Sequence, residues 1–245
     1  MFATEVTPFL FSSLQPTERE WLEKSVSPLG FVLASRKIRR AVVSCPDASS
    51  WAEQANQQAW TLDHWARVWI AAQLSETELH RLFDTAEIRE WVALVSALPW
   101  LSHPEAWLLR ATDAVRSNIG DVLDAIAFFN PYPERYFTES AWNQLILKVL
   151  FNDKPLANIQ GLSSRQNQAL AQDILLLAKE RWAAGRDLAS AAWQLIVSFP
   201  SDEALRMVEM LAQKPRVSDQ QAAQLVLAAW HRADQPTNVT WHDII

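Results

Sequence analysis

The chain has 245 residues, 49% hydrophobic and 20% charged, which is the composition of an ordinary globular protein with a sizeable core. Its formal net charge of -6 argues against nucleic acid as a partner, because neutralising phosphates requires a basic surface. Glycine occurs 4 times and proline 12 times, which favours helices joined by proline-containing loops over hairpins that need glycine.

Targeting and redox signals predict a cytoplasmic protein. The segment from Met1 to Glu5 does not open a basic and then apolar secretion signal. No apolar run approaches the roughly 18 residues that a membrane span requires, so we do not expect an integral membrane protein. Cys45 is the one cysteine, which excludes an internal disulfide and a thiolate metal cluster.

Helix starts are marked by capping boxes, in which Ser or Thr is followed three residues later by Glu or Gln. The pairs are Thr17/Glu20, Ser50/Glu53, Ser75/Glu78, Ser102/Glu105, Ser163/Gln166 and Ser218/Gln221. Thr61, Thr138 and Ser201 are further N-cap candidates. Because no stretch alternates between apolar and polar residues, the pattern predicts an all-α fold.

In the N-terminal part, a helix is predicted after Pro16 and another from Phe31 to about Val43. The second carries the densest basic run, from Arg36 to Arg40. A solvated face or an acidic partner explains this run, and contact with an anionic membrane surface is an alternative. The helix that opens after Thr61 has one apolar face, formed by Leu62, Trp65, Ala66, Trp69 and Ile70.

The longest predicted helix runs from Glu105 to Phe129. Asn118 falls inside its apolar stripe, so we expect its carboxamide to bond a neighbouring backbone or a ligand. Arg116 can pair with Asp113 on the opposite face. That face is either a solvated ion-pair surface or a polar strip that faces a pocket.

A proline turn separates this helix from the next. Asn130 precedes Pro131, which pushes Asn130 out of helical geometry and predicts the end of the helix. The core face of the following helix is predicted at Trp142, Leu145, Ile146, Val149 and Leu150. Asn143 lies at the border of that face, and Gln144 and Lys148 lie one turn apart on the other side of the helix. Polar residues around the turn are the candidates for binding a ligand or partner: Arg116, Asn118, Asn130, Tyr132, Tyr136, Asn143, Gln144 and Lys148.

Four more helices are predicted at about 164–184, 187–198, 202–213 and 219–232, with Gly185 as a C-terminal cap. The tail at 234–245 is expected to fray. About a dozen helices with short loops are typical of an α-solenoid-like array of antiparallel pairs. We expect a single domain over 1–245. Its 13 tryptophans either fill the core or line a pocket.

Motifs for known chemistry are missing from the sequence. It has no Gly-rich phosphate loop, no Gly-x-Ser-x-Gly elbow and no His-Glu-x-x-His. None of the five histidines pairs with another at i+3 or i+4. We therefore expect no metal and no cofactor, and no catalytic residue is identified.

Several short blocks carry a resemblance to a known family. They are Trp60–Asp63 with Ala66-Arg67, Arg116–Asn118, Ala125–Ala127, Asn130–Pro133 with Tyr136-Phe137, Ala141–Gln144, Leu147–Phe151, Gly161-Leu162 and Glu180–Arg186. Together they resemble the EboA family over roughly 30–200. The chain departs from the family pattern near Val32 to Arg40.

The resemblance implies a helical bacterial protein linked to making or trafficking a secondary metabolite. It implies genes alongside for a UbiA-type membrane prenyltransferase, a TatD-like metal hydrolase, a dehydroquinate-synthase-like cyclase and a sugar-isomerase-like protein. The resemblance implies no particular activity, because none is established for the family.

Three functional alternatives follow. The first is a non-catalytic binding or scaffold protein, which holds a cyclitol-like or prenylated intermediate or brings together pathway proteins, the prenyltransferase among them. The second is an enzyme of that pathway. In it Arg116 would bind an anionic group, Tyr132 or Tyr136 would act as the acid and Lys148 would be an electrostatic partner. In the third alternative these residues only tie loops to helices.

Overall fold

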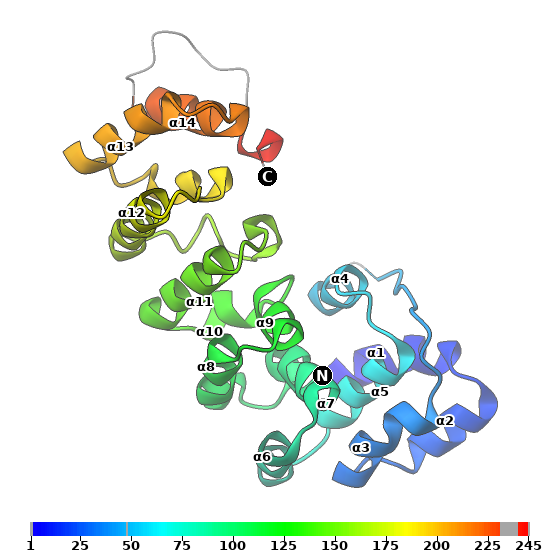
Figure 1. The fold of residues 1–245 in the computed structure, drawn as a ribbon. Coiled ribbons are helices and arrows are strands. Elements are labelled where there is room, and N and C mark those ends of the chain that lie inside the picture. Colours follow the sequence, from blue (N-terminus) through cyan, green and yellow to red (C-terminus); the bar gives the residue numbers. More distant parts are fainter. Residues whose placement is uncertain (1, 48, 231–239, 245) are drawn as a thin grey trace. The chain divides into compact units, whose positions relative to one another are not determined.

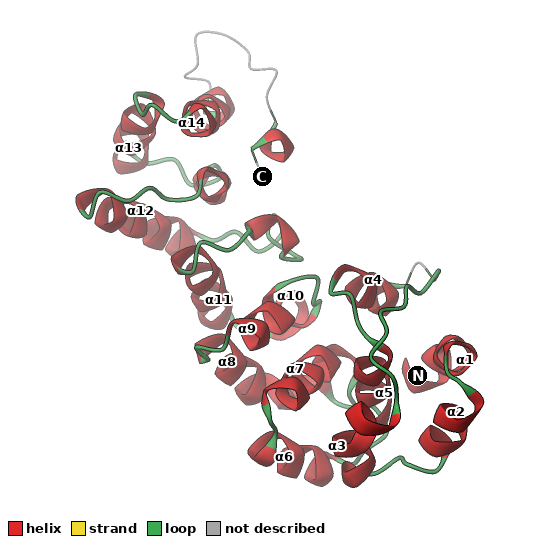
Figure 2. Cartoon of the chain, turned by 45° about the vertical axis from the view of Figure 1, so that its right-hand side comes forward, coloured by secondary structure: helices red, strands yellow, loops and turns green. Residues whose placement is uncertain are grey.

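We describe residues 2–47, 49–230 and 240–244 of a computed structural model of the chain. Helices and connecting loops make up this part of the chain, which has no β-strand (Figure 2). Val42 and Thr61 form an isolated β-bridge. The predicted all-α fold is confirmed. Of the tail that is predicted to fray, 234–239 and 245 lie outside the described residues, and Trp241–Asp243 form a short 3-10 helix, η5.

The chain divides into two compact units, Met1–Thr138 and Glu139–Ile245, which are described one at a time. Figure 1 labels their α-helices. The first unit contains α1 (Phe2–Ser13), α2 (Pro16–Glu23), α3 (Pro28–Lys37), α4 (Ser50–Gln57), α5 (Leu62–Ala71), α6 (Glu76–Thr85), α7 (Ile88–Ala97), η1 (Leu98–Trp100), η2 (Pro104–Trp107), α8 (Leu108–Arg116), α9 (Gly120–Ala127) and α10 (Tyr132–Tyr136).

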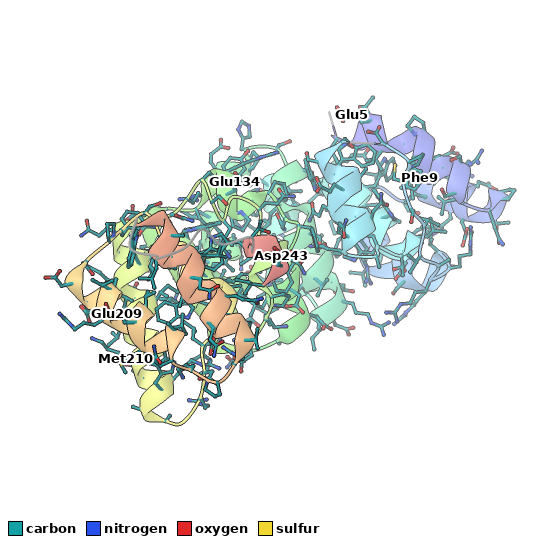
Figure 3. The ribbon with its side chains drawn as sticks, turned by 90° about the horizontal axis from the view of Figure 1, so that it is seen from above. Glu5, Phe9, Glu134, Glu209, Met210 and Asp243 are labelled. Carbon is teal, nitrogen blue, oxygen red and sulfur yellow. The ribbon has the colours of Figure 1, made fainter. Side chains whose placement is uncertain are left out.

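Tryptophans fill the core of this first unit. Trp65 on α5 is fully buried, and its ring centroid lies 5.2 Å from that of Phe9 on α1, which Figure 3 labels. The rings of Trp51 and Trp60 approach Trp65 at 6.0 and 4.9 Å. Edge-to-face packing of this kind stabilises a core beyond the area that it buries. These three tryptophans therefore fill the core.

Arg67 ties three helices of the first unit together from a buried position. It is 4% exposed, and its guanidinium donates to the carbonyl of Phe31 and to the hydroxyl of Ser35 on α3, both at 3.1 Å. A carboxylate oxygen of Glu90 on α7 lies 3.7 Å from the same guanidinium. Burial lowers the pKa of Arg67, and the charge of Glu90 opposes that effect. The cluster joins α3, α5 and α7.

The prediction of one helix from Glu105 to Phe129 is wrong, because the structure has three shorter helices in this range. η2 comes first, and α8 then runs only to Arg116. The hydroxyl of Ser117 accepts a hydrogen bond from the amide of Ile119 at 3.0 Å, so this side chain competes with the helical ladder. The chain resumes as α9 at Gly120.

Other helix ends also differ from the predicted ones. The capping box of Ser75 and Glu78 is confirmed, with the Ser75 amide donating to Glu78 at 2.9 Å. By contrast, α2 starts at Pro16 with its capping box at Gln15 and Glu18. The helix predicted to reach Val43 ends as α3 at Lys37, after which the backbone is extended.

The second unit contains α11 (Glu139–Phe151), η3 (Leu156–Asn158), α12 (Gln168–Ala183), η4 (Ser190–Ile196), α13 (Asp202–Ala212), α14 (Val217–Ala229) and η5. Ser201 caps α13 as predicted, accepting from the Ala204 amide at 3.1 Å. Gly185 has φ 67° and directly follows Ala184, the C-cap residue of α12, which confirms the predicted glycine cap. The helix predicted at 187–198 is a 3-10 helix. Of the helices in the described ranges, none is long and apolar enough to cross a bilayer.

Candidate ligand-binding site

A groove of about 700 Å³ runs between α11 and α12 in the second unit. Residues of the two helices line it: Glu139, Ser140, Asn143, Gln144, Leu147, Lys148 and Phe151 from α11, and Ala169, Asp173, Leu176, Leu177 and Glu180 from α12. A hollow of this volume is in the range that holds a small-molecule ligand. It gathers three of the predicted candidates, Asn143, Gln144 and Lys148.

The groove exists because each helix presents a second face away from its core. On α11 the lining positions 139, 143, 147 and 151 recur every four residues, so they share one side of the helix. Trp142, Leu145, Ile146 and Val149 occupy the other side and are fully buried, as the sequence predicts. On α12, Ile174 and Ala178 are fully buried in the same way.

Two polar contacts fix α11 against α12. The side chains of Asn143 and Asn167 donate to each other's oxygens, at 3.1 and 2.8 Å. At the other end, Arg181 donates to the carbonyl of Leu150 at 3.3 Å and pairs with Asp153. The N-terminal part of α11 thus lies near the N-terminus of α12, and the C-terminal parts of the two helices also lie near each other. The two helices run in the same direction, so antiparallel pairing does not describe this pair.

The groove is acidic on balance. Three carboxylates line it, from Glu139, Asp173 and Glu180, against the single ammonium of Lys148. Gln144 is exposed, and Lys148 is half-buried. Because the carboxylates lie at the start, middle and end of the helix faces, the excess negative charge extends along the whole groove. An anionic ligand would meet repulsion here that a neutral or cationic one would not.

Apolar side chains in the groove face solvent to an unusual degree. Phe151 is 64% exposed and Leu176 is 55% exposed, and Leu147 and Leu177 are half-buried beside them. Large exposed apolar residues gathered in one hollow mark a place where a ligand or partner removes them from water. The groove therefore combines an apolar surface with polar groups that can orient a bound molecule.

Arg116 and Asn118 lie in the first unit. Arg116 donates to Asp113 at 3.1 Å, and their side chains are 55% and 45% exposed, which matches the solvated ion pair given as one alternative. Such a pair stabilises a protein by only a few tenths of a kcal/mol. The expected burial of Asn118 is wrong: its side chain is exposed in the break between α8 and α9, since no helix continues there.

Asn130 and Tyr132 hold the proline turn in place. The Asn130 side chain donates to the carbonyl of Ala125 at 2.8 Å and accepts from the Tyr132 amide at 2.9 Å. The Tyr132 hydroxyl donates to the carbonyl of Pro104 at 2.7 Å, and burial raises its pKa above the ordinary value. Tyr136 is half-buried, with its ring centroid 4.9 Å from that of Tyr132. These contacts favour a structural role for Asn130 and Tyr132.

Sequence reasoning missed the α12 side of the groove. Asp173, Leu176 and Glu180 recur at spacings of three and four residues, and this was the signal available. Those positions lie on the side of α12 away from its buried residues Ile174 and Ala178. The sequence alone does not show whether a leucine on that side is exposed or half-buried, because its exposure depends on the position of the neighbouring helix.

The described residues offer no arrangement of three or more His, Cys, Asp or Glu side chains that could hold a metal ion. His64 lies beside Trp60, with ring centroids 4.7 Å apart, and its Nε2 atom is buried without a hydrogen-bond partner. Desolvation, together with the nearby charge of Arg67, lowers the pKa of His64 to about 3. The imidazole is therefore neutral at physiological pH.

Comparison with known proteins places most of the chain in one family. The family model described as metabolite traffic protein EboA matches residues 17–197. That range includes both helices of the groove. The comparisons with curated proteins and with solved structures found no match.

Proposed function

Because the chain belongs to the EboA family, we propose that it is a non-catalytic carrier that binds a small amphipathic metabolite in the groove between α11 and α12. The description of the family supplies the general role, metabolite traffic. The observation that carries the proposal is the hollow itself, where Phe151 and Leu176 stay exposed beside amide and charged side chains. The pathway is a bacterial secondary-metabolite pathway, as the family resemblance implies.

The lining of the groove suggests the chemistry of the ligand. An apolar portion would cover Phe151 and Leu176, and burying each CH₂ group contributes about 0.8 kcal/mol. Hydroxyl or amine groups would bond Gln144 and the carboxylates of Asp173 and Glu180. A cyclitol-like head group with an apolar tail fits this description, whereas a diphosphate would face three carboxylates and one ammonium.

The test is native mass spectrometry of the full chain purified gently from its own host. We expect a small molecule that remains bound to the wild-type protein. Gln144→Trp places a large ring in the groove from an exposed position, so it should empty the groove without disturbing the core. Arg206→Trp on the exposed side of α13 is the matched control and should keep the ligand.

Three results would reject the proposal. Wild-type protein that carries no small molecule, even after incubation with a host extract, would show that the groove is not a carrier site. Equal occupancy in the wild type and Gln144→Trp would place the ligand elsewhere. Conversion of the bound molecule during incubation would favour the enzyme alternative over a carrier.

Docking onto other proteins of the pathway, including a membrane prenyltransferase, is the scaffold form of the same proposal. The exposed apolar residues of the groove support it as well, because they suit a partner helix. The same preparation tests it: a pathway protein that co-purifies with the wild type and is lost in Gln144→Trp would assign the groove to that partner.

A further inference from the structure

The outward face of α3 is apolar, although the helix already buries its other face. Phe31 and Ala34 are fully buried against the first unit. On the opposite side, Leu29 is 66% exposed and Val32 is 37% exposed. Val42, beyond the helix, is 61% exposed. A helix with apolar residues on both faces is normally covered on both, so this face calls for a second apolar environment.

Exposed cations follow these apolar residues. Arg36 and Lys37 end α3, Arg40 lies three residues further on, and none of the three makes an ion pair with the described residues. Helical geometry places Leu29, Val32 and Arg36 within about 60° of the helix circumference.

Arg39 is different, because it is held by other groups. It pairs with the buried carboxylate of Glu18 and donates to the carbonyl of Ser13 at 2.6 Å. Arg36, Lys37 and Arg40 are thus three exposed cations within five residues of a chain whose net charge is -6.

We propose that this α3 face (Leu29, Val32, Arg36, Lys37 and Arg40) docks onto the surface of an anionic membrane. The aliphatic side chains would enter the boundary between head groups and acyl chains, while the cations would bind lipid phosphates. Exposed aliphatic side chains beside exposed cations match the acyl chains and phosphate head groups of an anionic bilayer, and this match selects a membrane as the partner. The contact would be peripheral, and it does not depend on the function of the groove.

The expected strength follows from the charge. Each basic residue near an anionic leaflet strengthens binding about fivefold, so the three together contribute about a hundredfold. Because these charges are exposed, salt should weaken the contact. Zwitterionic lipid should bind the chain at least tenfold more weakly than anionic lipid.

The test is co-sedimentation of the full chain with vesicles of phosphatidylcholine that contain about 30% phosphatidylglycerol, against vesicles of phosphatidylcholine alone. The variant Arg36→Gln/Lys37→Gln/Arg40→Gln should lose about a hundredfold in binding to the anionic vesicles. The control Arg135→Gln/Arg186→Gln/Arg206→Gln changes the net charge equally at exposed positions elsewhere and should bind like the wild type.

A second pair of variants tests the apolar contact. Leu29→Ser should weaken binding several-fold, whereas Met210→Ser, at an equally exposed position on α13 labelled in Figure 3, should not. Unchanged circular dichroism would show that all the variants are folded. No sedimentation with anionic vesicles, or equal losses in the α3 variants and their controls, would overturn the proposal. Binding to polyglutamate but not to vesicles would also overturn it and assign the face to an acidic protein.

Discussion

Asn143 and Asn167 form a reciprocal amide pair, in which each side-chain nitrogen donates to the other's side-chain oxygen, at 3.1 and 2.8 Å. The same oxygen of Asn167 also accepts from the amide of Leu170 at 2.8 Å and so caps α12. One residue thereby sets where α12 begins and how it is held against α11. The spacing of the two walls of the groove depends on this pair.

Replacing either asparagine with alanine should therefore destabilise the protein, and the loss should be larger for Asn167 than for Asn143. Asn167→Ala loses the pair and the helix cap, and we expect it to cost about 2 kcal/mol. Asn143→Ala loses only the pair and should cost about 1 kcal/mol. Urea unfolding monitored by circular dichroism measures both, with exposed Gln172→Ala as the control. Equal costs for the two variants would contradict the dual role of Asn167.

Tyr132 should make the protein sensitive to alkaline pH. Burial, together with the charges of Tyr136 and Glu105, raises its pKa, so the folded state keeps the phenol proton where the unfolded chain, with a pKa of about 10, releases it. The contribution of the neutral phenol is complete below about pH 10. Above that pH it declines by up to about 1.4 kcal/mol per unit, until the raised folded pKa is passed.

Tyr132→Phe removes this dependence along with the hydrogen bond to Pro104. The variant should be less stable than the wild type by about 1 kcal/mol at neutral pH. That deficit should disappear between about pH 10 and about pH 11. Urea unfolding of the variant and the wild type across this range measures the deficit. A constant deficit at every pH would disprove the assignment.

Arg67 should be among the most sensitive positions of the first unit. Arg67→Ala leaves Glu90 as a buried unpaired charge and three acceptors on α3 without this donor, for a loss of about 3–5 kcal/mol. Arg67→Lys should recover little, because an ammonium cannot reproduce the guanidinium fork. Thermal and urea unfolding test both variants. Exposed Arg89→Ala should stay within about 0.5 kcal/mol of the wild type.

Two glycines in helices should respond in opposite ways to alanine. A Cβ at Gly30 would lie 1.8 Å from the carbonyl oxygen of Ser25, so α3 must shift and the cost should be about 2 kcal/mol or more. A Cβ at Gly120 would meet nothing within 4 Å, so Gly120→Ala should be neutral or stabilising by up to about 1 kcal/mol. Unfolding midpoints compare the two. A harmless Gly30→Ala would show that α3 packs more loosely than the structure has it.

The negative charge of the groove should make a cationic amphiphile bind more tightly than an anionic one of equal chain length. Decyltrimethylammonium should bind the wild-type chain more tightly than decanoate, because three carboxylates face one ammonium. Asp173→Asn/Glu180→Gln should reduce the preference by about tenfold, if each charge contributes roughly 0.7 kcal/mol. Isothermal titration calorimetry measures the affinities, and Asp202→Asn/Glu209→Gln on exposed α13 is the control. A preference for decanoate would mean that Lys148 dominates the site.

Local sequence determined the fold class and much of the core. The capping box at Ser75, the Ser201 cap and the glycine cap after α12 were all predicted correctly, because each is a contact within about one turn. The buried faces of α5 and α11 followed from helical periodicity in the same way. Gln144 is exposed and Lys148 half-buried on the side of α11 away from its core face, as predicted, and the EboA membership also came from sequence alone.

Tertiary structure decided what the polar residues do. Asn143 pairs with a residue 24 positions away, and Tyr132 bonds a carbonyl 28 positions away, so no local pattern could have predicted either partner. The break after Arg116 depends on which of two competing hydrogen bonds Ser117 takes. The groove itself arises only once α12 lies alongside α11, since a hollow belongs to two helices and neither sequence alone defines it.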